Sequence, residues 1–382
     1  MKSNLLYLLI LQAASTVSVK TRCPSWFNKI GKKYLAATPD LPGIQMSVSS
    51  LQDGIECRGS WISPFKNFTT SPPLLIDAPY RLASVTKTFT SVTALKLVER
   101  GIIQVNGSII DYLPGWASEI LIATQGAENA SQITPWMLMH HTGGLDDFSS
   151  RPEYLALWSE NPDFELSLEG LLLWARDHLG PVALPGTLVH YSDLGYAYLG
   201  AVISHVTGLS LAAAVREAVQ MDSLGMDSLW WDILEEPPAG ATPRAGQWMG
   251  TMDITDIHGS VAMWGGTGLI GNSDDMVKFA RATHQGLLLG EAEMKMLYTT
   301  VPMPVDYDPE VGCGWMHNTD VGGLEAWYHR GGLGSFMYYF PERDLAVTGT
   351  INQINRLPLI REIVPEVVQN ILNDAKCSRA VA

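Results

Sequence analysis

Apolar and polar residues alternate in short runs near both ends of the chain, a pattern typical of half-buried β-strands. Residues 44–50 alternate, the Asp53-Gly54 pair provides a turn, and residues 55–62 pair back as a predicted hairpin. Towards the C-terminus the same reasoning predicts four more strands, at residues 312–317, 324–329, 335–340 and 345–351.

Between these two groups of strands the apolar spacing is helical. Residues 84–100 carry an apolar stripe that ends at Gly101, and a last helix is predicted for residues 362–374. Residues 105–260 are expected to form loops and helices, with helices at 135–140, 166–178 and 196–208. Strands at both ends with helices between them predict an α/β (α+β) fold, in which a helical region is inserted into one mixed sheet.

The composition is that of a globular protein. The 382 residues are 46% apolar and 17% charged, so the chain can bury a large core. The formal net charge of −14 argues against nucleic acid or an anionic membrane as a partner. The oligomeric state is left open by the sequence.

The N-terminus has the layout of a secretory signal peptide. Lys2 precedes an apolar stretch at residues 5–11, and small residues follow as far as Ser18. An apolar first helix is the alternative, but the stretch is too short to span a bilayer. We therefore expect residues 1–18 to be a signal peptide, no stable membrane anchor, and a secreted protein (extracellular, or periplasmic in a bacterium).

Two weaker features agree with export. Sequons at Asn67, Asn106 and Asn129 are usable in a eukaryotic secretory route. The four cysteines (Cys23, Cys57, Cys313 and Cys377) have no metal-like spacing, so export would allow one or two disulfides. A bond between Cys23 and Cys377 would tie the mature N-terminus to the last helix, although the sequence leaves the pairing undetermined.

Ser84 and Lys87 form a Ser-x-x-Lys motif at the start of the predicted helix. Residues three apart on a helix are neighbours, and a sheltered lysine amine can take the proton of a serine hydroxyl and make it a nucleophile. The alternative is that Ser84 caps the helix and Lys87 is solvated. Ser63 begins a second Ser-x-x-Lys sequence, but the residues after it do not continue a helix, so this sequence is expected to lie in a surface loop.

Two further segments carry candidate chemistry. Tyr191 precedes a predicted helix, and a phenol there can relay a proton between nucleophile, leaving group and water. His329 and Arg330 end a predicted strand and are followed by Gly331 and Gly332, which allow a backbone to approach a ligand closely. A backbone amide in this glycine segment, together with the amide of Ser84, could bind a developing oxyanion.

In order along the chain, these segments resemble the serine β-lactamase and penicillin-binding-protein superfamily, and most of all its class C-like branch of esterases, D-aminopeptidases and acyltransferases. The resemblance covers roughly residues 30 to 375 and rests on five motifs, at residues 81–87, 135–145, 191–196, 265–269 and 329–331. It implies a central antiparallel sheet flanked by helices, in a catalytic domain at residues 19–382. The sheet region would be about 19–110 and 262–382, and the inserted helical region about 111–261.

The resemblance also implies roles for residues. Ser84 would be the acylated nucleophile, Lys87 and Tyr191 would share the role of base, and the strand around His329 would form the edge of the site. Substrate-binding candidates are Asp193, His329, Arg330, Gly331 and Gly332. No cofactor and no metal are expected.

The sequence departs from the β-lactamase pattern at two positions. Relatives active on β-lactams commonly carry Lys-Thr-Gly on the edge strand, whereas this chain has His329, which is largely neutral at pH 7. Arg330 could supply positive charge, but neighbouring residues of a strand point to opposite faces. Asp193 replaces an asparagine, and a carboxylate near Lys87 would hold the ammonium form and shift the role of base towards Tyr191.

Other candidates have plainer interpretations. His140 and His141 are adjacent, do not share a face, and have no partner at metal-ligand spacing, so they are expected to shape a helix end. Asp146 and Asp147 are expected to form a turn or a cap. A set of tryptophans is a candidate lining for an apolar acyl pocket: Trp116, Trp230, Trp231 and Trp264.

The leading hypothesis from the sequence is a secreted serine hydrolase that acts on a small-molecule or short peptide ester or amide through an acyl-enzyme. Alternatives are an acyltransferase that uses the same acyl-enzyme and a β-lactamase or D-peptidase. From another class comes a catalytically silent sensor or scaffold of the same fold, against which the intact Ser84, Lys87 and Tyr191 argue.

Overall fold

The computed structural model describes residues 22–64, 68, 71–161, 163–304, 308–354 and 356–380. In this part of the chain the main sheet has eight strands in the order β2-β1-β13-β12-β11-β10-β9-β8, and all neighbours are antiparallel. The bounds are β1 (Gly43–Ser50), β2 (Ile55–Ile62), β8 (Val301–Pro302), β9 (Glu310–Val311), β10 (Met316–Val321), β11 (Leu324–Arg330), β12 (Ser335–Phe340) and β13 (Leu345–Thr350).

The predicted hairpin is confirmed: β1 and β2 pair from Gly43 opposite Ile62 to Ser50 opposite Ile55. The strand predicted at residues 312–317 is wrong, because β10 begins only at Met316. The chain instead turns at Gly314, which has a φ of +73° and whose Cβ, if it had one, would lie 2.8 Å from the carbonyl oxygen of Lys87. That close approach to a helix requires glycine and prevents a regular strand.

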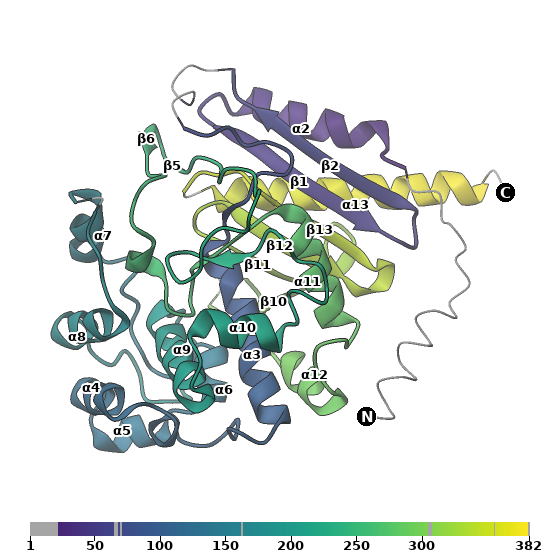
Figure 1. Cartoon of the computed structure of the whole chain (residues 1–382). Helices are drawn as coiled ribbons and strands as arrows, with labels where there is room; N and C mark the ends of the chain where they lie inside the picture. Colours follow the sequence, from purple (N-terminus) through teal and green to yellow (C-terminus); the bar gives the residue numbers. More distant parts are fainter. Residues whose placement is uncertain are drawn as a thin grey trace.

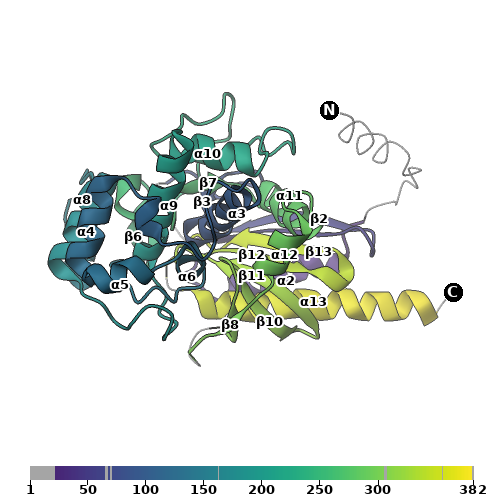
Figure 2. The same cartoon turned by 90° about the horizontal axis from the view of Figure 1, so that it is seen from below.

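Helices cover both faces of the sheet. Helices α2 (Ser25–Ala37) and α13 (Leu357–Ala380) lie on one face, and α11 (Ser273–His284) lies on the other (Figures 1 and 2). A hydrophobic core lies on each face of the sheet, and strand β12 contributes side chains to both. Its alternate residues Phe336, Tyr338 and Phe340 pack with α2 and α13, while Met337 and Tyr339 face the core shared with α11.

The remaining helices form a second region beside the sheet (Figure 1). Their bounds are α4 (Gly115–Gln125), α5 (Ala127–Gln132), α6 (Pro135–Met139), α7 (Pro152–Ser159), α8 (Leu168–His178), α9 (Asp193–Thr207), α10 (Leu211–Ala218) and, nearer the sheet, α12 (Glu291–Leu297). Small strands complete this side: β3 (Tyr80–Arg81), β4 (Trp230–Trp231), β5 (Trp248–Met249), β6 (Met252–Asp253) and β7 (Leu269–Gly271). The fold implied by the resemblance, an antiparallel sheet flanked by helices with helices inserted between its strands, is confirmed. The mixed sheet expected from the strand pattern is wrong, because every strand pair of the main sheet is antiparallel.

Helix α3 (Thr86–Glu99) follows a short 3₁₀ helix (Ala83–Val85) and lies between the sheet and the helical region (Figure 2). It is buried on nearly every side, not along one stripe as expected. Its threonines tolerate burial because their hydroxyls bond to backbone carbonyls, as Thr90 Oγ1 does to Gly265 O at 2.8 Å. A fully buried helix provides a rigid support for whatever its first turn carries.

The disulfide joins Cys23 to Cys57, with 4.9 Å between their Cα atoms. A pairing of Cys23 with Cys377 is therefore wrong, because the segment before α2 runs beside β2 through a bridge from Arg22 to Ile55. Cys313 is a buried free thiol.

Asn106 is exposed, whereas residues 1–18 and Asn67 lie outside the described residues. Among the described residues, no single helix has the length and apolar character to cross a membrane; α9 and α10 pass that test only jointly, as a pair bent by 81°.

Candidate active site

Ser84 lies in the 3₁₀ turn that leads into α3, half exposed between the buried residues Ala83 and Val85. The turn is held tightly, because Leu82 N donates to Leu269 O at 2.9 Å and Ser335 Oγ donates to Leu82 O at 2.5 Å. Ala83 adopts a φ of +47°, a left-handed conformation that residues with a Cβ seldom adopt. The Ser84 side chain caps neither helix, so the capping alternative is wrong.

Lys87 is fully buried one helical turn after Ser84. Its Nζ atom donates to Ser84 Oγ at 3.2 Å, to Gly266 O at 2.9 Å and to Asp193 Oδ1. Three acceptors match the three N–H groups of an ammonium ion, so in this arrangement Lys87 donates to the serine instead of accepting its proton. Lys87 and Asp193 thus form a buried ion pair.

Asp193 is the first residue of α9, and Asp147 lies directly beside it. The backbone N–H of Asp193 donates to Asp147 Oδ1 at 2.9 Å, and Ser149 Oγ donates to Asp147 Oδ2 at 2.6 Å. Burial, and then the charge of Asp193, raises the pKa of Asp147 from 3.8 to about 6. Asp147 caps α9 across a long sequence separation, and its carboxyl lines the same cavity as Ser84, which the sequence did not indicate.

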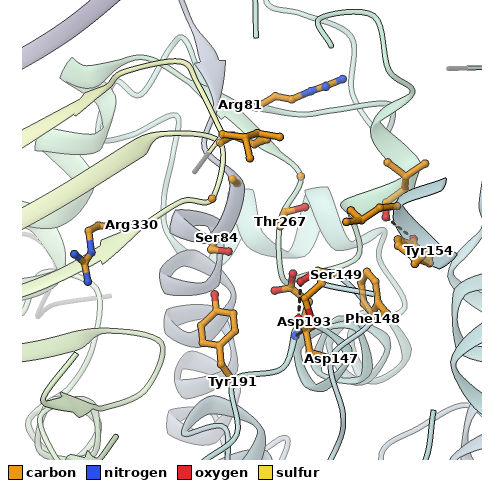
Figure 3. A pocket seen from close by; sticks show the side chains of 18 of the residues that line it. Arg81, Ser84, Asp147, Phe148, Ser149, Tyr154, Tyr191, Asp193, Thr267 and Arg330 are labelled. Carbon is orange, nitrogen blue, oxygen red and sulfur yellow. Dashed lines mark hydrogen bonds between the residues drawn. The ribbon is translucent and has the colours of Figure 1, made fainter. Parts of the chain in front are cut away.

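Tyr191 points its hydroxyl towards Ser84 (Figure 3). The centroid of its ring lies 4.9 Å from Lys87 Nζ, and the ring stacks on that of His141 with 4.3 Å between centroids. His141 accepts a hydrogen bond from Ser192 N at Nδ1, so its proton is on Nε2. Burial and the charge of Lys87 lower the pKa of His141, which therefore supports the phenol as a neutral ring.

His140 has a different environment from its neighbour. Its ring nitrogens face the carbonyl oxygens of Trp136 and Thr299, each at 2.9 Å, and its ring stacks on that of Trp136. The pair therefore shapes the end of α6. Within the described residues, no three His, Cys, Asp or Glu side chains gather in a way that could hold a metal ion.

His329 lies in β11, buried near the ring of Tyr191 with 6.3 Å between centroids. Its Nδ1 lies 2.9 Å from the carbonyl oxygen of Arg330, so Nδ1 carries the proton and Nε2 presents a bare lone pair. This Nε2 is buried and has no partner among the described residues. Burial, and then the charge of Lys87, lowers the pKa of His329 to about 3. At neutral pH it is a hydrogen-bond acceptor without charge.

Arg330 points away from Ser84 (Figure 3). Its guanidinium group pairs with Asp308 and lies 5.4 Å from the centroid of the Tyr328 ring. Tyr328 also donates to Asp308, at 2.7 Å. The alternation of β11 thus turns Arg330 to the face opposite His329, as the sequence indicated, and its guanidinium group pairs with Asp308, which Arg361 also approaches at 3.7 Å.

Gly331 and Gly332 lie against the turn that carries Ser84. A Cβ on Gly331 would lie 2.7 Å from Leu82 O and 2.9 Å from the Ala83 Cβ, so only glycine fits there. Gly332 is exposed to the cavity, and its N–H has no acceptor among the described residues. Ser84 N–H belongs to the first turn of its helix, where amides lack helical partners. These two amides are the candidate oxyanion donors.

A cavity of about 910 Å³ opens over Ser84. Of the residues predicted for the site, Ser84, Tyr191, Asp193, His329, Arg330 and Gly332 line it; Asp146 and Asp147, which were expected only to form a turn or a cap, line it as well. Thr267, from the 265–269 motif, also lines it (Figure 3). The tryptophan prediction is wrong: Trp230 and Trp231 are buried in a small sheet, Trp116 lies on the surface of α4, and none of the four lines the cavity. Trp158 of α7 lines it instead, with no sequence signal to mark it.

Comparisons with known proteins agree with this geometry. The Beta-lactamase family matches residues 48–358. Over 284 residues the chain is 25% identical to ML-236A carboxylate methylbutanoyltransferase of Penicillium citrinum, covering 68% of this chain and 65% of that one. Over 179 residues it is 28% identical to monacolin J acid methylbutanoyltransferase of Aspergillus terreus, covering 44% and 41%. The match therefore spans less than two thirds of either relative.

Solved structures show the same fold. The D-amino acid amidase of Ochrobactrum anthropi SV3 superposes with a TM-score of 0.73 at 22% identity, covering 90% of this chain and 99% of that one. A D-stereospecific amidohydrolase of Streptomyces sp. gives 0.72 at 23% identity, covering 85% and 94%. The family match spans most of the chain and includes the segments that carry Ser84, Lys87, Tyr191 and His329. The chain belongs to the Beta-lactamase family, in its class C-like branch.

Proposed function

We propose that this protein is a serine hydrolase that acts on an ester or amide through an acyl-enzyme at Ser84. The observation that carries the proposal is the contact of Ser84 Oγ with the buried Lys87 Nζ, at 3.2 Å, beneath a cavity large enough for a small-molecule substrate. A serine with no catalytic role gains nothing from a buried ammonium group, which is costly to desolvate.

In the first step Ser84 Oγ bonds to the substrate carbonyl carbon, and the bond from that carbon to the leaving group breaks. The serine proton passes to the Tyr191 oxygen while the phenol gives its own proton to the leaving group, so the relay is balanced. The ammonium group of Lys87 orients Ser84 Oγ and stabilises negative charge that develops on the phenol oxygen. The amides of Ser84 and Gly332 are placed to stabilise the oxyanion. Water, activated by Tyr191, then releases the acyl group.

The charges around the cavity favour a substrate without a carboxylate. Four arginines line the cavity, and each is paired: Arg81 with Asp232, Arg151 with Asp146, and both Arg330 and Arg361 with Asp308. The neutral His329 offers an acceptor where β-lactam-active relatives present a lysine. Penicillins and acyl-D-Ala-D-Ala peptides are therefore expected to be poor substrates, and uncharged esters or amides better ones.

Acyl transfer is the second candidate function. It is favoured by the two curated relatives above, whose names describe them as methylbutanoyltransferases. In that reaction an alcohol or amine takes the place of water in the second step. The ratio of transfer to hydrolysis in the presence of a neutral alcohol distinguishes the two functions.

We further propose that the protein is secreted. The signal-like residues 1–18 support this, as does the Cys23–Cys57 disulfide, since such bonds persist in oxidising compartments. Asn106 is exposed and would be open to glycosylation in a eukaryotic secretory route.

Labelling with a fluorescent fluorophosphonate tests the proposed function. The wild type should be labelled, and Ser84→Ala should not be, at an unchanged melting temperature. Ser63→Ala is the matched control, because Ser63 begins the other Ser-x-x-Lys sequence and lines no part of the cavity. If the folded wild type stays unlabelled, or if Ser84→Ala is labelled, the proposed function is wrong and a catalytically silent sensor or scaffold is favoured.

A further inference from the structure

One wall of the cavity is an apolar cluster separate from the two main cores. It has three buried members, Ile254, Ile257 and Val261, and five half-buried ones, Trp158, Phe164, Met249, Leu333 and Ile354. All of them except Phe164 line the cavity above Ser84. We call these seven lining residues the apolar wall. Apolar side chains left half exposed on a concave surface next to a reactive group are typical of a ligand site.

The apolar wall is built onto the same frame as the nucleophile. Arg81, three residues before Ser84, donates to the carbonyl oxygen of Ile254 at 3.4 Å and to that of Ile257. Tyr154 of α7 donates to the carbonyl oxygen of Val261. Leu333 directly follows Gly332, the candidate oxyanion donor. These contacts fix the apolar wall relative to the reacting carbonyl.

The position of the apolar wall also decides which part of the substrate meets it. Figure 3 shows Arg81 on one side of Ser84 and Tyr191 on the other. The leaving group must lie on the Tyr191 side, because the phenol gives it a proton. The acyl group then extends to the opposite side, where Arg81 holds the residues of the apolar wall.

From this arrangement we infer that the apolar wall is an acyl-binding subsite, and that the substrates carry an extended, uncharged acyl chain longer than butanoyl. The inference rests on the proposed function and narrows its substrate class. Each fully buried methylene group contributes about fourfold to kcat/KM. Partial burial of the four methylenes that separate octanoate from butyrate should still give about tenfold or more.

The test is a series of p-nitrophenyl acetate, butyrate and octanoate, which keeps the leaving group constant. In the wild type, kcat/KM should rise about tenfold or more from butyrate to octanoate. Trp158→Ala should lower the octanoate-to-butyrate ratio about fivefold or more. Leu333→Ser should lower it too, which covers the case that one variant fails to fold. Trp116→Ala is the matched control, because Trp116 lies outside the cavity, and it should leave the ratio unchanged.

Binding without turnover separates this inference from the proposed function. Calorimetry uses the Ser84→Ala background, which cannot acylate: octanamide should bind it more tightly than butanamide, and adding Trp158→Ala should weaken octanamide alone. If no ester is turned over but octanamide binds in this way, the subsite stands and the proposed catalysis fails. Three results would each overturn the subsite. The first is a kcat/KM that does not rise with chain length although short esters are turned over; the second is an equal octanoate-to-butyrate ratio in Trp158→Ala and Trp116→Ala. The third is equal affinity for octanamide and butanamide.

Discussion

The buried pair of Lys87 and Asp193 allows a quantitative test of the site. Lys87 is fully buried and the Asp193 side chain is 10% exposed, so neither charge is compensated by water. Removing one member of such a pair leaves a buried charge alone and costs about 3–5 kcal/mol in the free energy of unfolding. Asp193→Asn and Lys87→Met should each lose stability of this order at pH 7. The double variant, which holds neither charge, should recover much of the loss.

Urea unfolding of the four proteins measures this effect as a double-mutant cycle. We expect an interaction free energy of about 2–3 kcal/mol, well beyond the few tenths found for independent sites. Additive losses within about 0.5 kcal/mol would refute the ion pair as the state of the resting site.

Three further predictions follow from the geometry. Lys87→Ala and Tyr191→Phe should each lower kcat about 100-fold or more. The loss of kcat in the double variant should be smaller than the product of the two single losses, because the two groups serve one proton transfer. If the single losses multiply, the two groups act in separate steps. Asp147→Asn should gain stability relative to wild type as pH rises from 4 to 7. The pKa of Asp147 is raised from 3.8 to about 6, so between these pH values the native state keeps a proton that the unfolded chain releases. The free energy of unfolding of the wild type therefore falls as pH rises through that range, by at most about 3 kcal/mol. A difference between the two proteins that does not change with pH in urea unfolding would contradict this. His329→Lys should raise kcat/KM for nitrocefin relative to p-nitrophenyl butyrate about ten- to a hundred-fold, because a cation replaces a neutral acceptor; a wild type that already prefers nitrocefin, and loses that preference in Arg330→Ala, would restore the β-lactamase or D-peptidase alternative.

Much of the fold could be predicted because its patterns are local. The alternation in β2 and β12 and the apolar spacing of α13 gave these elements correctly or nearly so. Residues 312–317 could not be assigned, because the turn at Gly314 exists only where α3 approaches it. Helix α2 was not predicted, although its buried residues Phe27 and Ile30 belong to an amphipathic pattern that comes shortly after the signal-like segment.

The site also contains residues that local motifs predict and residues that only the folded chain brings in. Ser84, Lys87, Tyr191 and His329 belong to motifs whose residue types carry their own chemistry. The structure brings them together, with Lys87 buried beneath the cavity that the other three line. Asp147 was expected to form a turn or a cap, and it caps α9, but its place in the site could not be predicted, because it depends on a hydrogen bond from a residue 46 positions away. The apolar wall was missed for a related reason: residues 254–261 have no regular strand or long helix, and only the folded chain places them beside Trp158.

The central claim is that Ser84 carries a covalent acyl group during turnover. The direct measurement is intact-protein and peptide mass spectrometry after acid quenching of the wild type with p-nitrophenyl butyrate, with Ser84→Ala and Ser63→Ala in parallel. The account predicts one added butanoyl group in the wild type and in Ser63→Ala, located on the peptide that contains Ser84, and none in Ser84→Ala. An acyl group on another residue, or an equal mass increase in Ser84→Ala, would contradict it.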